Sequence, residues 1–376
     1  MKRVLLTGAS GTIGSALVPR LLGQADTTVQ LLIRATDPPA LQARFDGLLD
    51  YWGYARSGPD ASRLTPLLGD ISLPDFGLQP GVVQGLVATT THLVHCAASV
   101  KLNMSAEQAR ATAVQPTRTV LSLARRGLRA GALQKVDLVS TVGVWGCTPG
   151  HMPERRLPEV SIFHNTYEAA KAEAERVVWA EGDGLPITVH RPSMVVGQAS
   201  DGRVINFQVF YHLCEFLSGA RTFGIMPALG HTRLDTVPVD WVADAIAWSV
   251  DHPETAGHIL HLCSGPDRAI ALPQLQDAVR LAWRQHGRRV PRLWQVKRSW
   301  LERLIPLIGT LAGQKAQRAL RGLPPVLAYL AEDQGFLNSQ TLVRLEAAGL
   351  PLPRIEQYLA PVLDHYLRHQ PAPGRP

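Results

Sequence analysis

Three side chains have the types and spacing needed to move a proton to or from a carbonyl oxygen. Tyr167 and Lys171 are four residues apart, so on a helix they would share one face. A phenol, with a pKa of about 10, is a weak acid–base group at neutral pH, but a neighbouring ammonium would lower that pKa. Ser140-Thr141 ends an apolar run, and a hydroxyl there could hydrogen-bond the same oxygen. We therefore predict Tyr167, Lys171 and a hydroxyl of the Ser140-Thr141 pair as catalytic groups, against the simpler alternatives of a surface Tyr/Lys pair and a strand-end cap at Thr141.

A glycine-rich segment lies between an apolar run and a helical pattern near the start of the chain. Its glycines would allow a tight turn and a close approach of the backbone to a pyrophosphate, which the helix N-terminus would attract. The spacing is GxxGxxG and not the more familiar GxGxxG. We predict a dinucleotide site here, contacted by Thr7, Gly8, Ser10, Gly11, Thr12, Ile13 and Gly14.

Two polar residues at later strand ends bear on the choice of cofactor. Arg34 stands where an acidic residue would accept the ribose hydroxyls of NAD, and an arginine there can instead pair with the 2′-phosphate of NADP. This favours NADPH over NADH, although a solvated surface arginine is the alternative. Asp70 could accept a hydrogen bond from the adenine amino group, or could simply cap a turn.

Strand and helix patterns alternate through the first half of the chain. The helical patterns end in glycine or polar turns, and the segment over 106–124 contains Pro116, which should mark a kink or a start. This alternation predicts an α/β fold with a doubly wound parallel sheet, whose ligands bind at the carboxyl ends of the strands. We expect strands over 4–7, 29–34, 64–68, 92–95, 136–140, 187–191 and 258–263, helices over 13–22, 106–124 and 167–180, and a turn followed by an amphipathic helix over 235–250.

Composition excludes several protein classes. The 376 residues are 45% hydrophobic and 18% charged, which suits a folded core and not a disordered or collagen-like chain. The four cysteines form no close pair, so we expect no zinc site, no metal and a reducing, cytoplasmic location. The net charge of +7 fits an anionic ligand, an acidic partner or a membrane surface, and we expect no nucleic-acid partner.

The ordered motifs resemble those of the extended short-chain dehydrogenases/reductases. Besides the glycine segment and YEAAK at 167–171, the chain has GDI at 69–71, HCAA at 95–98, STVGVWG at 140–146 and RPS at 191–193. In that register Thr141, and not Ser140, matches the family's catalytic hydroxyl. The resemblance adds cofactor contacts at Asp70, Ile71, Cys96, Ala97, Ala98, Arg191, Pro192 and Ser193, and at Tyr167 and Lys171 themselves.

A finer resemblance is to the thioester reductase and fatty acyl reductase branch, the male-sterility type. It rests on LLIRA at 31–35, HCAASVKLN at 95–103, HNTYEAAKAEAE at 164–175 and HRPSMVVGQASDG at 190–202. It implies NADPH-dependent reduction of an acyl thioester, carried on coenzyme A or a carrier protein, to an aldehyde or further to an alcohol. The alternatives are a ketone/alcohol oxidoreductase, a sugar-nucleotide epimerase, or a cofactor-binding regulatory protein with reduced catalysis.

One motif departs from the family pattern. The family commonly has N-V-x-G-T after the fourth strand, whereas this chain has Ala113-Val114-Gln115-Pro116-Thr117. The asparagine and the glycine are both replaced, which puts an asparagine-dependent proton relay in doubt and leaves the regulatory alternative open.

The chain divides by pattern into a nucleotide-binding part and a substrate lobe. We predict a Rossmann domain over 1–195, joined by 233–265, and a smaller C-terminal substrate lobe made of 196–232 and 266–368. The tail 369–376 is expected to be disordered.

The lobe has a strongly basic stretch. Residues 280–321 hold eleven Lys or Arg and one acid, Glu302. Such a segment would attract acyl-CoA phosphates, an acidic acyl-carrier protein or an anionic membrane, unless it is only a solvated basic face. Within it, the apolar stretch 300–311 could be a lid over an acyl tunnel, a peripheral membrane contact or buried core.

Overall fold

A seven-stranded parallel sheet forms the centre of the protein. The computed structural model describes residues 1–100, 104–158, 162–220, 222–296 and 334–370. All neighbouring strands of the sheet run parallel, in the order β12-β7-β5-β4-β1-β2-β3. This confirms the predicted doubly wound α/β fold. The strands are β1 (Lys2–Thr7), β2 (Thr27–Ile33), β3 (Leu64–Leu68), β4 (His92–His95), β5 (Lys135–Val139), β7 (Ile187–Pro192) and β12 (Ile259–Leu262).

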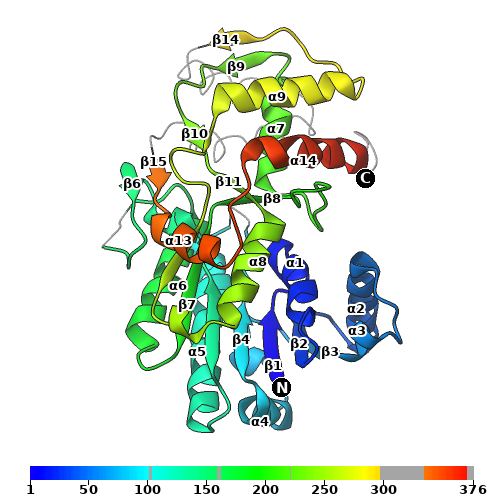
Figure 1. Cartoon of the computed structure of the whole chain (residues 1–376), viewed down its shortest axis with the longest axis vertical. Coiled ribbons are helices and arrows are strands. Elements are labelled where there is room, and N and C mark those ends of the chain that lie inside the picture. Colours follow the sequence, from blue (N-terminus) through cyan, green and yellow to red (C-terminus); the bar gives the residue numbers. More distant parts are fainter. Residues whose placement is uncertain (101–103, 159–161, 221, 297–333, 371–376) are drawn as a thin grey trace.

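Helices cover both faces of this sheet (Figure 1). Alternate residues of a strand point to opposite faces, so Val4 and Leu6 belong to one core while Leu5 belongs to the other. The first core also includes α1 (Thr12–Leu22), α2 (Pro38–Trp52) and α8 (Val239–Val250). The second includes α4 (Pro80–Thr89), α5 (Ala106–Arg129) and α6 (Thr166–Glu181).

The helix α5 does not begin at its proline. It starts at Ala106, where Ser105 and Gln108 form a reciprocal capping box, and it continues through Pro116 to Arg129. Ala113, Val114 and Val120 pack into the core beneath the sheet. That packing and the cap hold the helix together across the missing N–H of the proline. The helix predicted from Ala106 is confirmed, and of the two expectations for Pro116, a kink or a start, the start is wrong.

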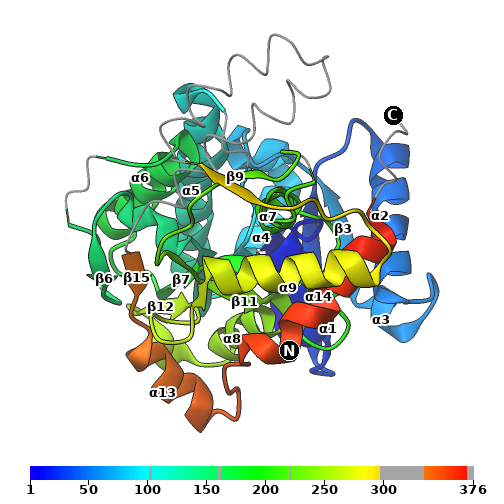
Figure 2. The same ribbon diagram turned by 90° about the horizontal axis from the view of Figure 1, so that it is seen from above.

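A third core lies above the carboxyl ends of the strands (Figure 1). Aromatic rings fill it: Phe207 meets Tyr211 edge to face at 4.8 Å and Tyr366 at 4.9 Å. Seen from above, α9 and α14 lie across the top of the molecule (Figure 2). The elements of this lobe are β8 (Met194–Val196), α7 (Val209–Leu217), β9 (Ile225–Pro227), β10 (Arg233–Leu234), β11 (Thr236–Pro238), β13 (Ile270–Ala271), α9 (Leu272–Gln285), β14 (Trp294–Val296) and α14 (Ile355–His369).

Several short elements connect the two parts. The strand β6 (Gly150–Met152) pairs with β15 (Gln334–Phe336), and α13 (Ser339–Ala347) packs beside β12, with Leu345 in the core of the sheet. The sequence had assigned α13 to the substrate lobe. The remaining short helices are α3 (Pro59–Ser62), η1 (Pro74–Gly77), η2 (Val142–Trp145) and η3 (Pro253–Thr255).

Parts of the predicted lobe lie outside the described residues. These parts include the apolar stretch 300–311 and the whole of the basic segment after Val296. Residues 371–376 of the predicted tail also lie outside the described residues. The tail's first residue, His369, ends α14. No helix in the described ranges is both long and apolar enough to span a membrane.

Candidate active site

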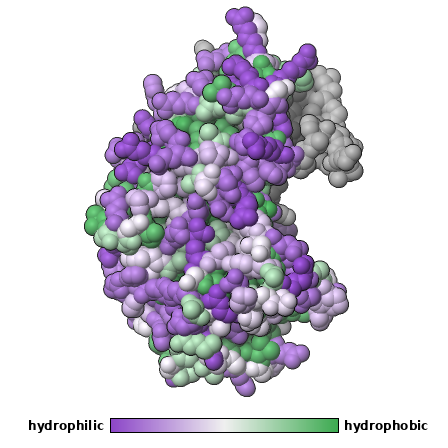
Figure 3. Space-filling view, turned by 45° about the vertical axis from the view of Figure 1, so that its right-hand side comes forward, coloured by the Kyte–Doolittle hydropathy of each residue, from purple (hydrophilic) through white to green (hydrophobic). Residues whose placement is uncertain are grey.

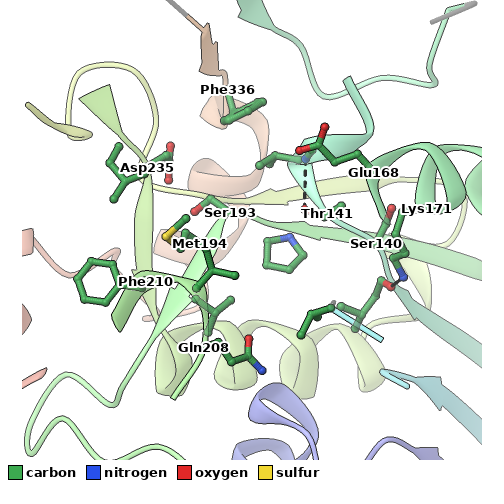
Figure 4. Close-up of a pocket in the computed structure, with 18 of the residues that line it drawn as sticks. Ser140, Thr141, Glu168, Lys171, Ser193, Met194, Gln208, Phe210, Asp235 and Phe336 are labelled. Carbon is green, nitrogen blue, oxygen red and sulfur yellow. Dashed lines mark hydrogen bonds between the residues drawn. The ribbon is translucent and has the colours of Figure 1, made fainter. Parts of the chain in front are cut away.

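A cavity of about 580 Å³ lies between the carboxyl ends of the sheet and the lobe (Figure 4). Its walls come from the glycine segment, from the ends of β4, β5 and β7, from α6, and from the lobe. Of the predicted site residues, it brings together Gly11, Thr12, Ile13, Gly14, Cys96, Ala98, Thr141, Tyr167, Lys171, Pro192 and Ser193.

The three predicted catalytic side chains line this cavity because β5 ends just before Thr141 and α6 begins just before Tyr167. Asn165 caps α6 by accepting a hydrogen bond from Glu168 N at 3.0 Å, which starts the helix one residue before Tyr167. Thr141 follows β5, and its Oγ1 accepts from Gly143 N at 3.2 Å. The Thr141 side chain is near enough to Tyr167 to lower the pKa of its phenol, and both side chains line the cavity. Two hydroxyl groups are thus held together at the edge of the sheet.

On balance, the pKa of Tyr167 is raised and not lowered. Burial and, to a lesser extent, the charge of Glu168 raise the pKa of Tyr167 to about 12, although the Thr141 hydroxyl acts to lower it. The prediction of a lowered pKa for Tyr167 is therefore wrong for the protein alone, because desolvation of the phenolate dominates. The phenol stays protonated at neutral pH, which suits a proton donor.

Lys171 is held by the backbone of the neighbouring strand. Its Nζ donates to Val139 O at 2.7 Å. Burial lowers the pKa of this amine to about 8, while Glu175 and Cys96 act to raise it. Near neutral pH the side chain is mostly protonated, although it lies almost fully buried at the cavity wall.

The glycine segment forms a cradle that a side chain would fill. Gly8 has φ +84°, and a Cβ added there would lie 2.7 Å from Ala97 N. A Cβ on Gly14 would overlap Gly8 O. Gly11 N donates to Gly8 O at 2.9 Å, and α1 begins at Thr12 with its first N–H groups at the cavity. This arrangement fits the pyrophosphate of a dinucleotide.

Arg34 and Asp70 follow neighbouring strands at the same end of the sheet. Arg34 is exposed, as a phosphate ligand should be. Burial alone would raise the pKa of Asp70, but hydrogen bonds from Ser72 and the charge of Arg34 outweigh it and lower that pKa. The oxygen Asp70 Oδ1 accepts from Ser72 N at 2.9 Å and from Ser72 Oγ at 2.7 Å. Asp70 therefore structures its own turn, which was the alternative reading.

Two predicted cofactor ligands have side chains turned into the interior. Thr7 is buried, with Oγ1 2.7 Å from His95 Nδ1 and 3.3 Å from Ala97 N, which donates to it. Arg191 has no exposed surface, and it forms an ion pair with Glu175. These side chains support the site from behind. The others predicted, Gly8, Ser10, Ile71 and Ala97, are near the cradle or the strand ends but outside the cavity lining.

The lobe supplies an apolar wall that the sequence did not identify residue by residue. Met194, Val209, Phe210, Leu234 and Phe336 line the cavity opposite the catalytic groups, and Figure 4 shows Phe336 and Phe210 on different sides of it. Motif spacing could not have found them, because they come from four separate elements. An apolar acyl group would be accommodated here.

Polar residues missed by the sequence also line the cavity. Glu168 Oε2 accepts from His164 N at 3.2 Å and lies 2.8 Å from His164 Nδ1. Gln208 reaches from the lobe to the glycine segment, where its Nε2 donates to Thr12 Oγ1 at 2.8 Å. The pattern HNTYE contained the first pair, but an acidic residue next to Tyr167 is usually solvent-exposed on a helix.

Two acids, Asp235 and Asp240, shape the lobe through backbone groups. Asp235 accepts from Ser264 N at 2.7 Å and Gly265 N at 3.0 Å, and Asp240 accepts from Ala199 N at 3.0 Å. They fix loops around the cavity. Across the described ranges, no group of three His, Cys, Asp or Glu side chains could hold a metal ion.

The described part of the basic segment is only partly free to bind a partner. Arg280 is buried and donates to Ser218 O at 2.9 Å and Pro291 O at 2.8 Å, and Arg288 donates to Leu367 O at 3.0 Å. Arg289 and Arg292 are exposed. The surface is largely hydrophilic and is indented between its upper and lower parts (Figure 3).

Similar proteins match the chain over much of its length. The family model described as "Male sterility protein", an NAD-binding domain, matches residues 6–246. The isonitrile lipopeptide synthase of Streptomyces coeruleorubidus is 33% identical over 245 residues, which are 65% of this chain and 16% of that protein. The aldehyde reductase lnaA of Aspergillus flavus is 30% identical over 295 residues, covering 74% of this chain and 27% of that protein.

Solved structures share the fold. The terminal R domain from the myxalamid PKS-NRPS biosynthetic pathway superposes with a TM-score of 0.81 at 24% identity, covering 98% of this chain and 91% of that one. The reductase domain of a nonribosomal peptide synthetase from Mycobacterium tuberculosis gives 0.73 at 20% identity, with 98% and 92% covered. The chain spans less than a third of the length of the curated relatives it matches. By its family match it belongs to the male-sterility type of NAD(P)-binding extended short-chain dehydrogenases/reductases.

Proposed function

We propose that this protein reduces an acyl thioester to an aldehyde with NADPH. The observation that carries the proposal is that Thr141, Tyr167 and Lys171 together line a cavity bounded by the glycine cradle on one side and an apolar wall on the other. A carbonyl oxygen placed beside the two hydroxyls would leave its acyl chain against Phe210 and Leu234.

The bound cofactor supplies a hydride to the thioester carbonyl carbon. Thr141 and Tyr167 donate hydrogen bonds to the oxygen as its negative charge develops, and Tyr167 passes its proton to it. The resulting hemithioacetal collapses when its C–S bond breaks, giving an aldehyde and a thiol. A second hydride and proton would convert the aldehyde to an alcohol.

Lys171 supports this chemistry from below. Its ammonium lies against the end of β5 and would bind the ribose of the nicotinamide nucleotide beside Tyr167. After the tyrosine has given up its proton, the positive charge of Lys171 stabilises the phenolate that remains. The raised pKa of Tyr167 in turn favours the donor role over the acceptor role.

NADPH is favoured over NADH because Arg34 stands exposed at the end of β2, where a 2′-phosphate would lie. The thioester would be carried on the phosphopantetheine arm of coenzyme A or of a carrier protein. A solved thiolation-reductase di-domain of an archaeal nonribosomal peptide synthetase covers 98% of this chain with a TM-score of 0.73. We favour a carrier protein, whose acidic surface would meet the exposed arginines of the lobe.

The test is NADPH turnover on three substrates: an acyl-CoA, the same acyl group on a carrier protein, and a ketone of similar size. A thiol reagent follows thiol release in parallel with NADPH oxidation. Equal initial rates of both with a thioester support the proposal. Oxidation only with the ketone indicates a ketone reductase, and binding of NADPH with no turnover indicates a regulatory protein.

A further inference from the structure

A buried ion pair lies directly behind the catalytic residues. Glu175, on α6, accepts from Arg191 Nε at 3.1 Å through Oε2, and Arg191 Nη2 meets its other oxygen. Glu175 is 2% exposed and Arg191 is fully buried. Neither lines the cavity, so neither can touch a substrate there.

Glu175 contacts the catalytic elements on two sides. Its Oε2 accepts from Ser140 Oγ at 2.9 Å, and Ser140 directly precedes Thr141. It also lies one helical turn after Lys171, on the same face of α6, and its charge raises the pKa of that amine. One carboxylate therefore contacts the residue beside the catalytic threonine and acts through its charge on the catalytic lysine.

Arg191 completes the network from the next strand. Its Nη1 lies 3.1 Å from His261 Nε2, whose Nδ1 is 2.7 Å from Leu337 O, and its guanidinium stands 5.7 Å from the centre of the Trp145 ring. Burial and the charge of Arg191 lower the pKa of His261 to about 3, so that ring is neutral. Arg191 thus fixes the Glu175 carboxylate in one orientation, and the neutral His261 adds no second positive charge beside it.

The other titratable groups that act on Lys171 are uncharged at neutral pH, so Glu175 is its counter-charge. Cys96, after β4, has a pKa raised to about 12 by burial, and the buried His95 has a pKa of about 3, so both are uncharged at neutral pH. Tyr167, on the same helix, is also protonated. The charge that favours the ammonium form of Lys171 is therefore that of Glu175.

We propose that Glu175, held by Arg191, is a positioning residue that keeps Lys171 protonated and fixes the Ser140–Thr141 strand end. This rests on the proposed reductase function for its kinetic consequence, but its electrostatic part does not need turnover. It also gives Arg191 a role different from the cofactor contact implied by the family resemblance.

The test compares Glu175→Gln with a matched control. Because removing an opposite charge shifts a buried pKa by about one unit or more, the fall in kcat at alkaline pH should move to lower pH by about one unit in Glu175→Gln. Asp137→Asn breaks another buried ion pair in the same sheet, with Lys135, and should lower the unfolding temperature without moving the pH profile. An unmoved profile in Glu175→Gln overturns the proposal.

A second variant guards against a simple loss of folding. Glu175→Gln/Arg191→Met removes both charges, so it should recover stability while the profile remains shifted. If the double variant restores the wild-type profile, the pair is only structural and the proposal fails.

An activity-independent measurement separates this proposal from the reductase assignment. NMR of protein labelled with ¹³C at the lysine ε-carbon follows the titration of Lys171, identified by its loss in Lys171→Met. A lower Lys171 pKa in Glu175→Gln supports the electrostatic role even if the wild type reduces no thioester. If the wild type is an active reductase and the Lys171 pKa is the same in Glu175→Gln, the positioning role is overturned while the reductase assignment stands.

Discussion

Lys171 donates a hydrogen bond of 2.7 Å to the carbonyl oxygen of Val139, the last residue of β5. This contact ties the first turns of α6 to the strand end that carries Thr141 two residues later. Since Tyr167 lies one helical turn before Lys171, the same bond fixes the position of the Tyr167 phenol relative to the Thr141 hydroxyl. The relative positions of the three catalytic groups follow from this junction of helix and strand.

The pH dependence of the reductase should reflect the buried lysine. The folded-state pKa of Lys171 is about 8, below its ordinary 10.5, so the amine is charged below that pH and neutral above it. We expect kcat at saturating NADPH to fall as the pH rises through about 8, because the neutral amine cannot stabilise the phenolate. Lys171→Met should be slow at every pH. A wild-type rate that stays constant up to pH 10 (about the ordinary lysine value) would contradict this role.

Removing the proton donor should separate binding from turnover. Tyr167→Phe keeps the ring, so NADPH affinity should change little while turnover of the thioester falls by about 10² or more. Tyr54→Phe, outside the cavity, is the matched control and should keep the wild-type rate. Fluorescence titration with NADPH and stopped-flow oxidation give the two quantities. If Tyr167→Phe turned over at the wild-type rate, the acid would have to be another group.

Cofactor preference should depend on Arg34. A hydrogen bond to a charged group contributes about 1.5–3 kcal/mol, so Arg34→Ala should weaken NADPH binding by roughly 10- to 150-fold. NADH binding should change little because it lacks the 2′-phosphate. The control is Arg56→Ala. Arg56 follows α2, and its side chain pairs with Asp46 and Asp50 on that helix. Equal losses for both cofactors would mean that Arg34 holds the loop and not the phosphate.

The glycine cradle allows a test that separates backbone strain from steric overlap. Gly8 and Gly53 have similar φ values, +84° and +73°, but only Gly8 has atoms within 4 Å of an added Cβ. Gly53→Ala should cost about 1–2 kcal/mol of unfolding free energy from the left-handed backbone alone. Gly8→Ala should cost more and should also abolish NADPH binding, because Ala97 must move. Chemical denaturation and cofactor titration check both; equal losses would show that the cradle is not tight.

Local sequence patterns predicted the glycine cradle and the Tyr167–Lys171 pair, because both depend only on residues close together in the chain. The apolar run before Gly8 and the helical pattern after it are sufficient to place the cradle, and a spacing of four is sufficient to place Tyr167 and Lys171 on one face. The same local signals predicted all seven strands of the sheet, which are β1 to β5, β7 and β12.

Residues whose roles depend on distant partners could not be predicted in this way. Glu175, in the charged stretch KAEAE, has the pattern of a solvated helix face, and its burial depends on Arg191 from another strand. Phe336 enters the cavity wall from a strand that pairs with β6, far away in the sequence. The tyrosine pKa was predicted wrongly for a similar reason, since the sequence contains the neighbouring charge but not the extent of burial.

The basic face of the lobe should matter only for a carried substrate. Arg289 and Arg292 are exposed, whereas Arg280 and Arg288 are tied to backbone carbonyls, so the first two are the residues to reverse. Arg289→Glu/Arg292→Glu should raise the Michaelis constant for an acyl-carrier protein and leave reduction of a small free aldehyde unchanged. In the wild type, the same constant should rise with salt, since exposed charge pairs are screened over about 8–10 Å near physiological ionic strength.

The matched control reverses two exposed arginines at the opposite end of the molecule. Arg3, at the start of β1, and Arg129, at the end of α5, lie far below the lobe (Figure 1). Arg3→Glu/Arg129→Glu changes the net charge equally, so a general electrostatic attraction would weaken with both double variants. A docking surface on the lobe would weaken with Arg289→Glu/Arg292→Glu alone. If that variant also lost aldehyde reduction, the arginines would belong to the fold of the lobe, because the catalytic groups lie on β5 and α6.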